Sequence, residues 1–162
     1  MSIKAMGGIF GRNPTFNTLN VESNLIAEGG ITLGSDSYAA ANTLDDYEEG
    51  TWTPVANNYD GSITINSATY VKIGKIVIAK AAITFSSTTD GSGVNLTGLP
   101  FSHSGADKGN SGAIVGASFG TASYMKMIGS GTINIIDFSG GNVTYTTVSG
   151  STLNFVLTYE TA

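Results

Sequence analysis

The sequence has no cysteine and very little charge. Because cysteine is absent from its 162 residues, disulfide bonds and thiolate-based metal or redox chemistry are excluded. Only 12% of the residues are charged, against about 25% in an average globular domain. The net charge is −5, and lysine and arginine form no cluster. Nucleic-acid binding needs a basic surface that offsets the phosphates, so we expect no nucleic-acid partner.

Long apolar runs are also missing. No run approaches the ~20 apolar residues that span a bilayer. The N-terminal stretch "MSIKAMGGIFGRNP" lacks the apolar segment of a secretory signal. We therefore expect neither membrane insertion nor a cleaved leader.

Glycine and small polar residues are abundant instead. The chain contains 22 glycines and many Ser, Thr and Asn residues, yet 41% of it is hydrophobic. This is not the composition of a disordered chain. A chain of this length buries roughly two thirds of its unfolded surface, which is enough for a core. The length favours one domain with a short appendage.

From Thr51 onward, short apolar runs alternate with turn residues such as "NNYDG", "TTDGSG" and "SGADKGNSG". Many short strands at this spacing predict an all-β fold, an antiparallel, jelly-roll-like β-sandwich knob over residues 51–162. No stretch has a sustained helical period. We expect strands at 51–55, 62–66, 69–73, 75–85, 93–99, 112–119, 124–128, 131–138, 142–148 and 152–160.

Alternation within two of these runs predicts which face is buried. Ile76 and Ile78 make the second face of 75–85 partly apolar, so we expect that strand to be central or to lie beneath an interface. The expected buried faces are Leu153, Phe155, Leu157 and Tyr159 in one run and Val77, Ala79, Ala81, Ile83 and Phe85 in the other.

The first 41 residues differ from the rest. Leu19 and Val21 alternate, as do Ile31 and Leu33, which predicts short strands on either side of a turn at 29–30. Such strands have too few apolar groups to form a core alone, because an isolated hairpin is marginal in water. We expect an extended β arm that buries its apolar side chains against its own domain, sister chains or another protein.

The segment "LDDYEEGTWTPV" places four carboxylates beside the only tryptophan. Glycoside cleavage needs two carboxyls about 5–9 Å apart, one in an apolar setting that raises its pKa, and no apolar pocket is evident here. A calcium site is the better of these two alternatives, because Ca²⁺ accepts clustered carboxylates, but the spacing matches no calcium-binding loop. We interpret residues 42–50 as a solvated acidic joint, a loop that ends at Gly50. Its acids are Asp45, Asp46, Glu48 and Glu49.

Beyond this joint, Trp52 is expected to anchor the first strand in the core or in an interface. Pro54 cannot donate a ladder hydrogen bond, which predicts an edge strand. His103, the only histidine, is expected on a surface loop; Ser102 and Asp107 are near it in sequence, but a triad is defined by geometry. No phosphate-binding loop is present. We expect no enzymatic activity, metal or cofactor.

Several stretches resemble a module that is common among structural proteins of tailed bacteriophages. They are "FGRNPTFNTLNVESNL", "EGGITLG", "ANTLDDYEEGTWTPV", "ATYVKIGKIVIAKAAITFSS" and "NLTGLPF". The resemblance covers residues 9–101 and is most specific at 42–55 and 68–75. It implies a non-enzymatic homotrimer on the virion surface, made in the cytoplasm of the bacterial host.

The resemblance also implies roles for individual residues. The arm would anchor and trimerise the chain through Phe10, Phe16, Leu19, Val21, Leu25, Ile31 and Leu33. Trp52, Tyr70 and Phe101 would anchor the knob in its core or interface. The aromatic residues in general favour packing over sugar binding.

Three functions follow as alternatives. Since the module makes up almost the whole chain, we favour a capsid cement or decoration trimer whose arm grips the major capsid protein or another virion protein. The close alternative is a short tail or head fibre whose knob binds a host-surface glycan through loops such as 86–93 or 102–111. A polysaccharide-cleaving enzyme is the weakest alternative, because the chain is too short for the β-helical bodies of such proteins.

Overall fold

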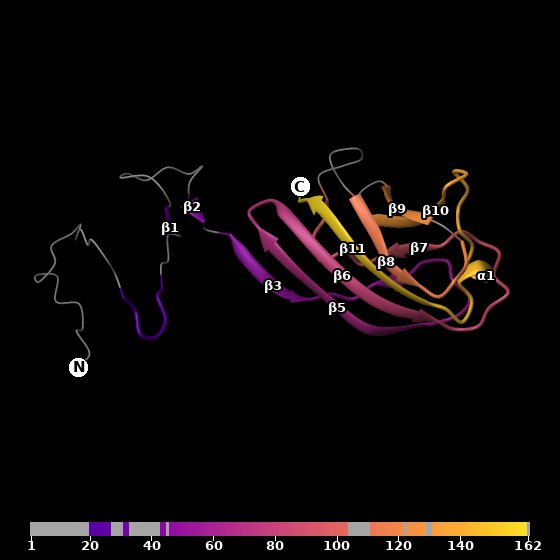
Figure 1. Cartoon of the computed structure of the whole chain (residues 1–162), viewed down its shortest axis with the longest axis horizontal. Helices are drawn as coiled ribbons and strands as arrows, with labels where there is room; N and C mark the ends of the chain where they lie inside the picture. Colours follow the sequence, from indigo (N-terminus) through magenta and orange to yellow (C-terminus); the bar gives the residue numbers. More distant parts are fainter. Residues whose placement is uncertain are drawn as a thin grey trace, which may run out of the picture.

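The computed structural model describes residues 20–26, 31–32, 43–44, 46–103, 111–121, 123–128 and 131–161. Within them the fold is all-β and antiparallel, as predicted, apart from one short helix. Nine strands form one sheet (Figure 1). Their order is β3 (Tyr47–Thr51), β5 (Ile63–Ile73), β6 (Ile76–Phe85), β11 (Thr152–Glu160), β8 (Ser111–Ala117), β9 (Ser123–Ile128), β10 (Thr132–Asp137), β7 (Asn95–Thr97) and β4 (Val55–Ala56).

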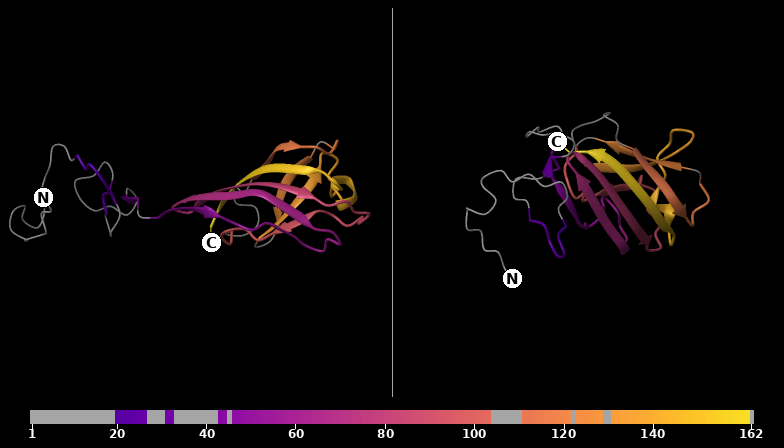
Figure 2. Two further views of the ribbon diagram at one scale, coloured as in Figure 1. Left: turned by 90° about the horizontal axis from the view of Figure 1, so that it is seen from below. Right: turned by 60° about the vertical axis from the view of Figure 1, so that its left-hand side comes forward.

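The sheet is one continuous, strongly curled half-barrel and not two separate stacked sheets. Figures 1 and 2 show β3, β5, β6 and β11 as one wall, with β9, β10 and β7 behind it. The chain itself links the two edge strands, because only three residues separate Thr51 at the end of β3 from Val55 at the start of β4. Four Cα–Cα steps span at most about 15 Å, so the curl brings the sheet edges together here.

A glycine allows this close approach. Gly98 has φ +86°, and a Cβ added there would lie 2.2 Å from the carbonyl oxygen of Thr53. Only glycine fits both the conformation and the contact. Pro54 lies between the two edge strands, which agrees with the prediction that it marks an edge.

Side chains from both walls fill the space inside the curl. The predicted inner faces are buried: Leu153, Phe155, Leu157 and Tyr159 on β11 are at most 2% exposed, and those on β6 at most 5%. Strand β6 lies inside the sheet between β5 and β11, as expected. The opposite wall contributes side chains that alternate in the same way, among them Leu96, Met125, Met127, Ile133 and Ile135.

Three strand predictions are wrong in detail. Residues 62–66 and 69–73 belong to the single strand β5, which a bulge between Ile65 and Ser67 keeps in register with β6. Trp52, Thr53 and Pro54 are not in a strand. Residues 142–148 contain the helix α1 (Tyr145–Val148) instead of a strand, because Thr144 caps it by accepting a hydrogen bond from the Thr147 amide. Among the described residues no helix is long and apolar enough to cross a membrane.

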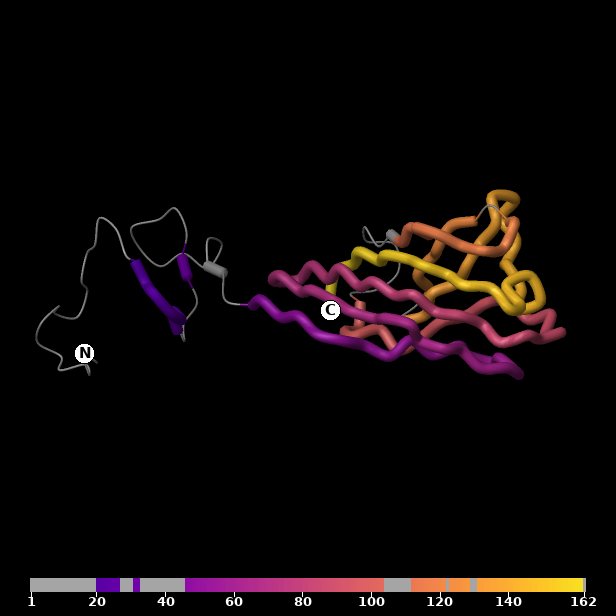
Figure 3. The backbone as a smooth tube through the Cα atoms, turned by 60° about the horizontal axis from the view of Figure 1, so that its bottom comes forward, coloured from indigo at the N-terminus to yellow at the C-terminus, as the bar shows by residue number. Residues whose placement is uncertain are grey.

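The described part of the arm lies beyond the end of the sheet where β3 begins (Figure 3). Its strand β1 (Ile31–Thr32) was predicted, but it pairs with β2 (Thr43–Leu44), in the segment predicted to be a joint. The strand predicted around Val21 is wrong, because residues 20–26 contain no strand. Phe10, Phe16, Leu19, Leu33 and the turn at 29–30 lie outside the described residues.

Candidate functional site

The acidic segment is an edge strand and not the predicted loop. Tyr47–Thr51 pairs antiparallel with β5, so its side chains alternate between the two faces of the sheet. Glu48 lies opposite Lys72 and accepts a hydrogen bond from the Tyr70 hydroxyl, whereas Glu49 accepts one from Tyr47 (2.8 Å) on the other face. Charge-rich composition favours a loop locally, but pairing with β5 decides the structure.

This alternation places Glu48 and Glu49 on opposite faces of the sheet. Asp46 forms an ion pair with Lys72, and Asp45 lies outside the described residues. Among the described residues no group of three or more His, Cys, Asp or Glu side chains could hold a metal ion. Asp46, Glu48 and Glu49 each bond to a different side chain of the sheet, so they are not arranged as ligands of one metal ion.

At the end of the domain that faces the arm, Lys72 lies among several side chains that contact it or each other. Its ammonium group lies 5.5 Å from the centre of the Phe101 ring, and the Lys72 residue is only 9% exposed. Phe101 meets Tyr70 edge to face with the ring centres 5.2 Å apart. The Phe101 amide donates to the Tyr159 hydroxyl (3.3 Å). Burial raises the pKa of Tyr159 to about 12.

The three predicted knob anchors therefore have different surroundings. Trp52 is 7% exposed, donates from Nε1 to the Lys80 carbonyl oxygen (3.0 Å) and meets Phe155 edge to face. The structure thus places Trp52 in the core. Tyr70 and Phe101 are half-buried and pack against the core from its arm-facing end.

His103 is buried and not on the surface as expected, with 3% of its area exposed. It forms an isolated β-bridge with Thr161, so the end of β11 brings it inside. Ser102 beside it is exposed, and Asp107 lies outside the described residues. The prediction that His103 lies on the surface was wrong, because the local sequence does not show which later strand covers a loop.

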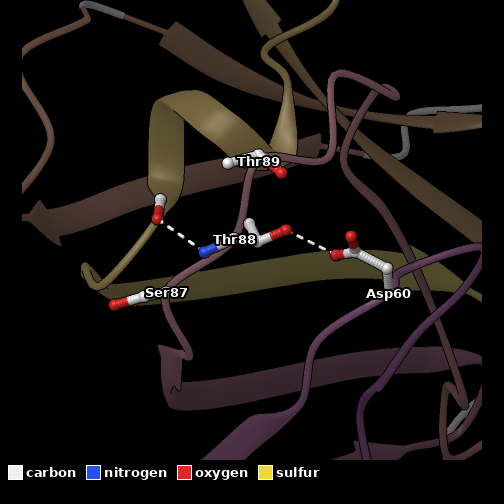
Figure 4. Close-up of a pocket in the computed structure, with 5 residues that line it drawn as sticks. Asp60, Ser87, Thr88 and Thr89 are labelled. Carbon is white, nitrogen blue, oxygen red and sulfur yellow. Dashed lines mark hydrogen bonds between the residues drawn. The ribbon is translucent and has the colours of Figure 1, made fainter.

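A polar hollow lies at the opposite end of the domain, beside α1 (Figures 1 and 4). It has a volume of about 410 Å³ and is lined by Asp60, Ser87, Thr88, Thr89 and Ser149. The Thr88 hydroxyl donates to Asp60, and the Thr88 amide donates to the Ser149 hydroxyl (2.8 Å). Part of the predicted recognition loop 86–93 thus forms one wall of the hollow.

Asp90 holds this loop in place. Its Oδ1 accepts hydrogen bonds from the amide (2.8 Å) and the hydroxyl (2.6 Å) of Ser92, and these bonds lower the pKa of the carboxyl. The Asp90 carbonyl oxygen accepts from the Thr146 amide (2.7 Å) of α1. Beneath the loop, the rings of Tyr59 and Tyr145 stack with centres 4.3 Å apart. The hollow is therefore bordered by a fixed surface of hydroxyl and carboxylate groups.

These groups suit hydrogen bonding better than catalysis. An acid–base pair needs one group whose pKa is shifted towards neutrality by burial or charge. The Asp90 pKa moves the other way, and His103 belongs to the arm-facing end. Polar hydroxyls and a carboxylate can accept and donate hydrogen bonds to a polyhydroxylated ligand.

Most described aromatic residues pack in or against the core, as the sequence favoured. Three are exposed: Tyr47 (56%), Tyr124 (39%) and Phe138 (74%). Tyr124 and Phe138 contact each other, with ring centres 5.9 Å apart and planes inclined at 37°. Sequence reasoning missed this pair; the only local signal was Phe138 directly before the turn residues "SGG".

Comparison with known proteins does not extend this description. No protein family, curated protein or solved structure matches the chain significantly. The resemblance of residues 9–101 to a phage module, and the functions that it implies, therefore stay predictions.

Proposed function

We propose that this chain is a non-enzymatic structural protein of a tailed-phage virion, a cement or decoration protein that binds the outer capsid surface as a homotrimer. The observation that carries the proposal is a contrast within the chain. The sheet has a complete core of its own, with many side chains at or near 0% exposure. In the arm, the described apolar residues Val21, Leu25, Ile26 and Ile31 are 39–84% exposed.

This contrast supports a partner for the arm. Burying a Val, Leu or Ile side chain fully is worth about 1.5–3 kcal/mol. A single copy leaves that free energy unused in its arm, whereas three copies that wrap around each other, or a capsid floor beneath them, provide the missing surface. The arm then anchors the chain, and the sheet domain stands on the virion surface.

Copy number tests the attachment point. Quantitative mass spectrometry of purified particles, with the major capsid protein as the internal standard, should give on the order of hundreds of copies for a cement. A handful or a few dozen would favour a fibre, and absence from the particles would overturn the virion assignment.

Head stability tests the role of the arm. Particles carrying Leu25→Ser together with Ile26→Ser should release their DNA at a lower temperature than wild-type particles, because the arm no longer grips its partner. Val115→Ser is the matched control, since Val115 is 69% exposed but lies on β8 in the sheet. Equal release temperatures for all three particles would contradict a cement.

A second candidate function is a short tail or head fibre that binds a host-surface glycan. The observation that favours it is the fixed polar hollow at the end remote from the arm, which part of the loop 86–93 lines. The described part of the other predicted loop, residues 102–103, lies at the arm-facing end. Ser87→Arg with Thr89→Arg should then abolish adsorption to host cells, whereas Ser67→Arg on β5 should not.

A further inference from the structure

Two aromatic rings meet on the outer surface of the sheet without entering its core. Tyr124 on β9 lies directly opposite Ile136 on β10, and Phe138 is two residues further along the same face. The neighbours of Tyr124 and Ile136 in sequence, Met125 and Ile135, point into the core instead. Tyr124 and Phe138 thus form a separate outer pair, with Phe138 74% exposed.

The turn that carries Phe138 is held rigidly. Asp137 Oδ1 accepts hydrogen bonds from the Ser139 amide (2.9 Å), the Ser139 hydroxyl (2.6 Å) and the Gly141 amide (2.9 Å). The Asp137 amide in turn donates to the Gly141 carbonyl oxygen (2.8 Å). Gly140 closes the turn with φ +91°, a conformation that other residues rarely adopt. The ring of Phe138 is therefore presented from a fixed backbone.

The exposed ring of Phe138 adds little to the fold, although Tyr124 beside it lies opposite Ile136, which is only 6% exposed. A phenylalanine that is 74% exposed contributes little burial. An exposed aromatic side chain on a rigid turn has the properties of a binding anchor, because little conformational entropy is lost when a ligand contacts it.

The size and surroundings of the pair indicate the ligand. Two aromatic side chains offer at most about 150–250 Å² each, whereas a stable protein interface buries about 800 Å² per partner. The flanking residues Ser139 and Asn142 are exposed and polar, so the apolar surface does not extend over the turn. A small ligand with one apolar face and polar edges fits this pattern better than a second protein.

We propose that Tyr124 and Phe138 form a stacking platform for a saccharide ring. The C–H face of a pyranose is apolar and carries partial positive charge, which complements the negative face of an aromatic ring. Its hydroxyls would lie towards Ser139 and Asn142, whose side chains can exchange hydrogen bonds with them. The turn projects at the end of the domain that carries α1 (Figure 1). The platform does not depend on whether the arm attaches to a head or to a tail.

A glycan array tests the proposal with the purified full chain. The array carries lipopolysaccharide O-chains and capsular polysaccharides from diverse bacteria, and each positive glycan is then titrated by saturation-transfer NMR. We expect saturable binding to at least one glycan. Phe138→Ala should weaken it at least tenfold, Tyr124→Ala should also weaken it, and Phe138→Trp should retain it. Tyr47→Ala removes an exposed aromatic residue far from the pair and should leave the affinity unchanged.

Three results would overturn the platform. They are an array without any bound glycan, a glycan whose affinity is unchanged by Phe138→Ala, and a change of oligomeric state in Phe138→Ala during sedimentation without glycan binding. Misfolding is controlled by the thermal unfolding midpoint, which should match that of the wild type because Phe138 is exposed. A negative glycan-binding result would not change the expected copy number or the expected effect of the arm variants. It can therefore be distinguished from a result that overturns the virion assignment.

Discussion

The two ends of the curled sheet are held together by different chemistry. At the arm-facing end, bonds join segments that are far apart in sequence: Lys72 pairs with Asp46, Tyr70 donates to Glu48, and the Phe101 amide donates to the Tyr159 hydroxyl. At the end beside α1, the carboxylates of Asp90 and Asp137 accept bonds from residues two to four positions away, although Thr88 and Thr146 also bond to distant segments. The first kind of contact fixes the strand that continues from the arm, and the second fixes the shape of exposed turns.

Because of this difference, the two ends can serve separate functions. Contacts with β5 make β3 part of the sheet, so the strand that follows the arm is fixed to the domain. The turn at Asp137 can change in sequence with little effect on the core, because its side-chain bonds close within four residues. Variants that change one end alone therefore test whether the two ends are stabilised independently of each other.

The largest expected effect comes from the core that both ends share. Trp52→Ala in the middle of the sheet and Tyr145→Ala beside the polar hollow should each lower the free energy of unfolding by about 3–5 kcal/mol. Both side chains are buried and hydrogen-bonded to distant backbone groups. Urea unfolding followed by circular dichroism should show one transition for each variant. Two separate transitions would mean that the ends unfold independently.

A smaller effect should be confined to the arm-facing end. Lys72→Ala removes the ion pair with Asp46 and the contact with Phe101, and we expect a loss of roughly 1–3 kcal/mol. Amide hydrogen exchange should become faster in β3 but stay unchanged around Asp90. Lys126→Ala on β9 is the control, because Lys126 is exposed on the other wall. Faster hydrogen exchange at both ends would contradict the expectation that Lys72 stabilises only the arm-facing end.

Alkaline pH should also act on the arm-facing end. The folded-state pKa of Tyr159 is raised to about 12, above its ordinary value near 10. Its contribution to stability is therefore complete below pH 10 and is lost as pH rises towards 12. In Tyr159→Phe, stability measured by urea unfolding should fall less steeply between pH 10 and 12 than in the wild type. Equal slopes of stability against pH in the two proteins would show that burial of the Tyr159 hydroxyl does not cause the loss of stability at alkaline pH.

Acid should act on the end beside α1 through Asp90 and Asp137. Hydrogen bonds from Ser92 and Ser139 lower the pKa of these carboxyls below the ordinary value of 3.8. The stabilisation is therefore present above that pH and is lost as pH falls through the lower folded-state pKa. Replacing both aspartates by asparagine should flatten the decline of stability between pH 5 and 2. A decline as steep as in the wild type would assign the acid sensitivity to other groups.

The sequence predicted what depends on period and burial, and it failed where distant contacts decide. Alternation in 152–160 and 75–85 gave the buried faces correctly, because these strands lie inside the sheet and one face of each meets the core. Whether the sheet curls or splits into two was not predictable, since the curl is built from contacts between separate segments, such as that of Gly98 with Thr53. The burial of His103 and the pairing of Tyr124 with Phe138 likewise arise between separate segments.

The smallest effect is expected from the acidic residues that first suggested a site. Glu49 is exposed on the outer face of β3 and bonds only to Tyr47 among the described contacts of its carboxylate. Asp45→Asn with Glu49→Gln should change the free energy of unfolding by less than about 0.5 kcal/mol, as is usual for surface substitutions. Calorimetry with and without Ca²⁺ should give the same unfolding temperature for wild type and variant. A Ca²⁺-dependent rise that the double variant abolishes would restore a metal site, and β3 would then be a ligand-bearing strand as well as the link to the arm.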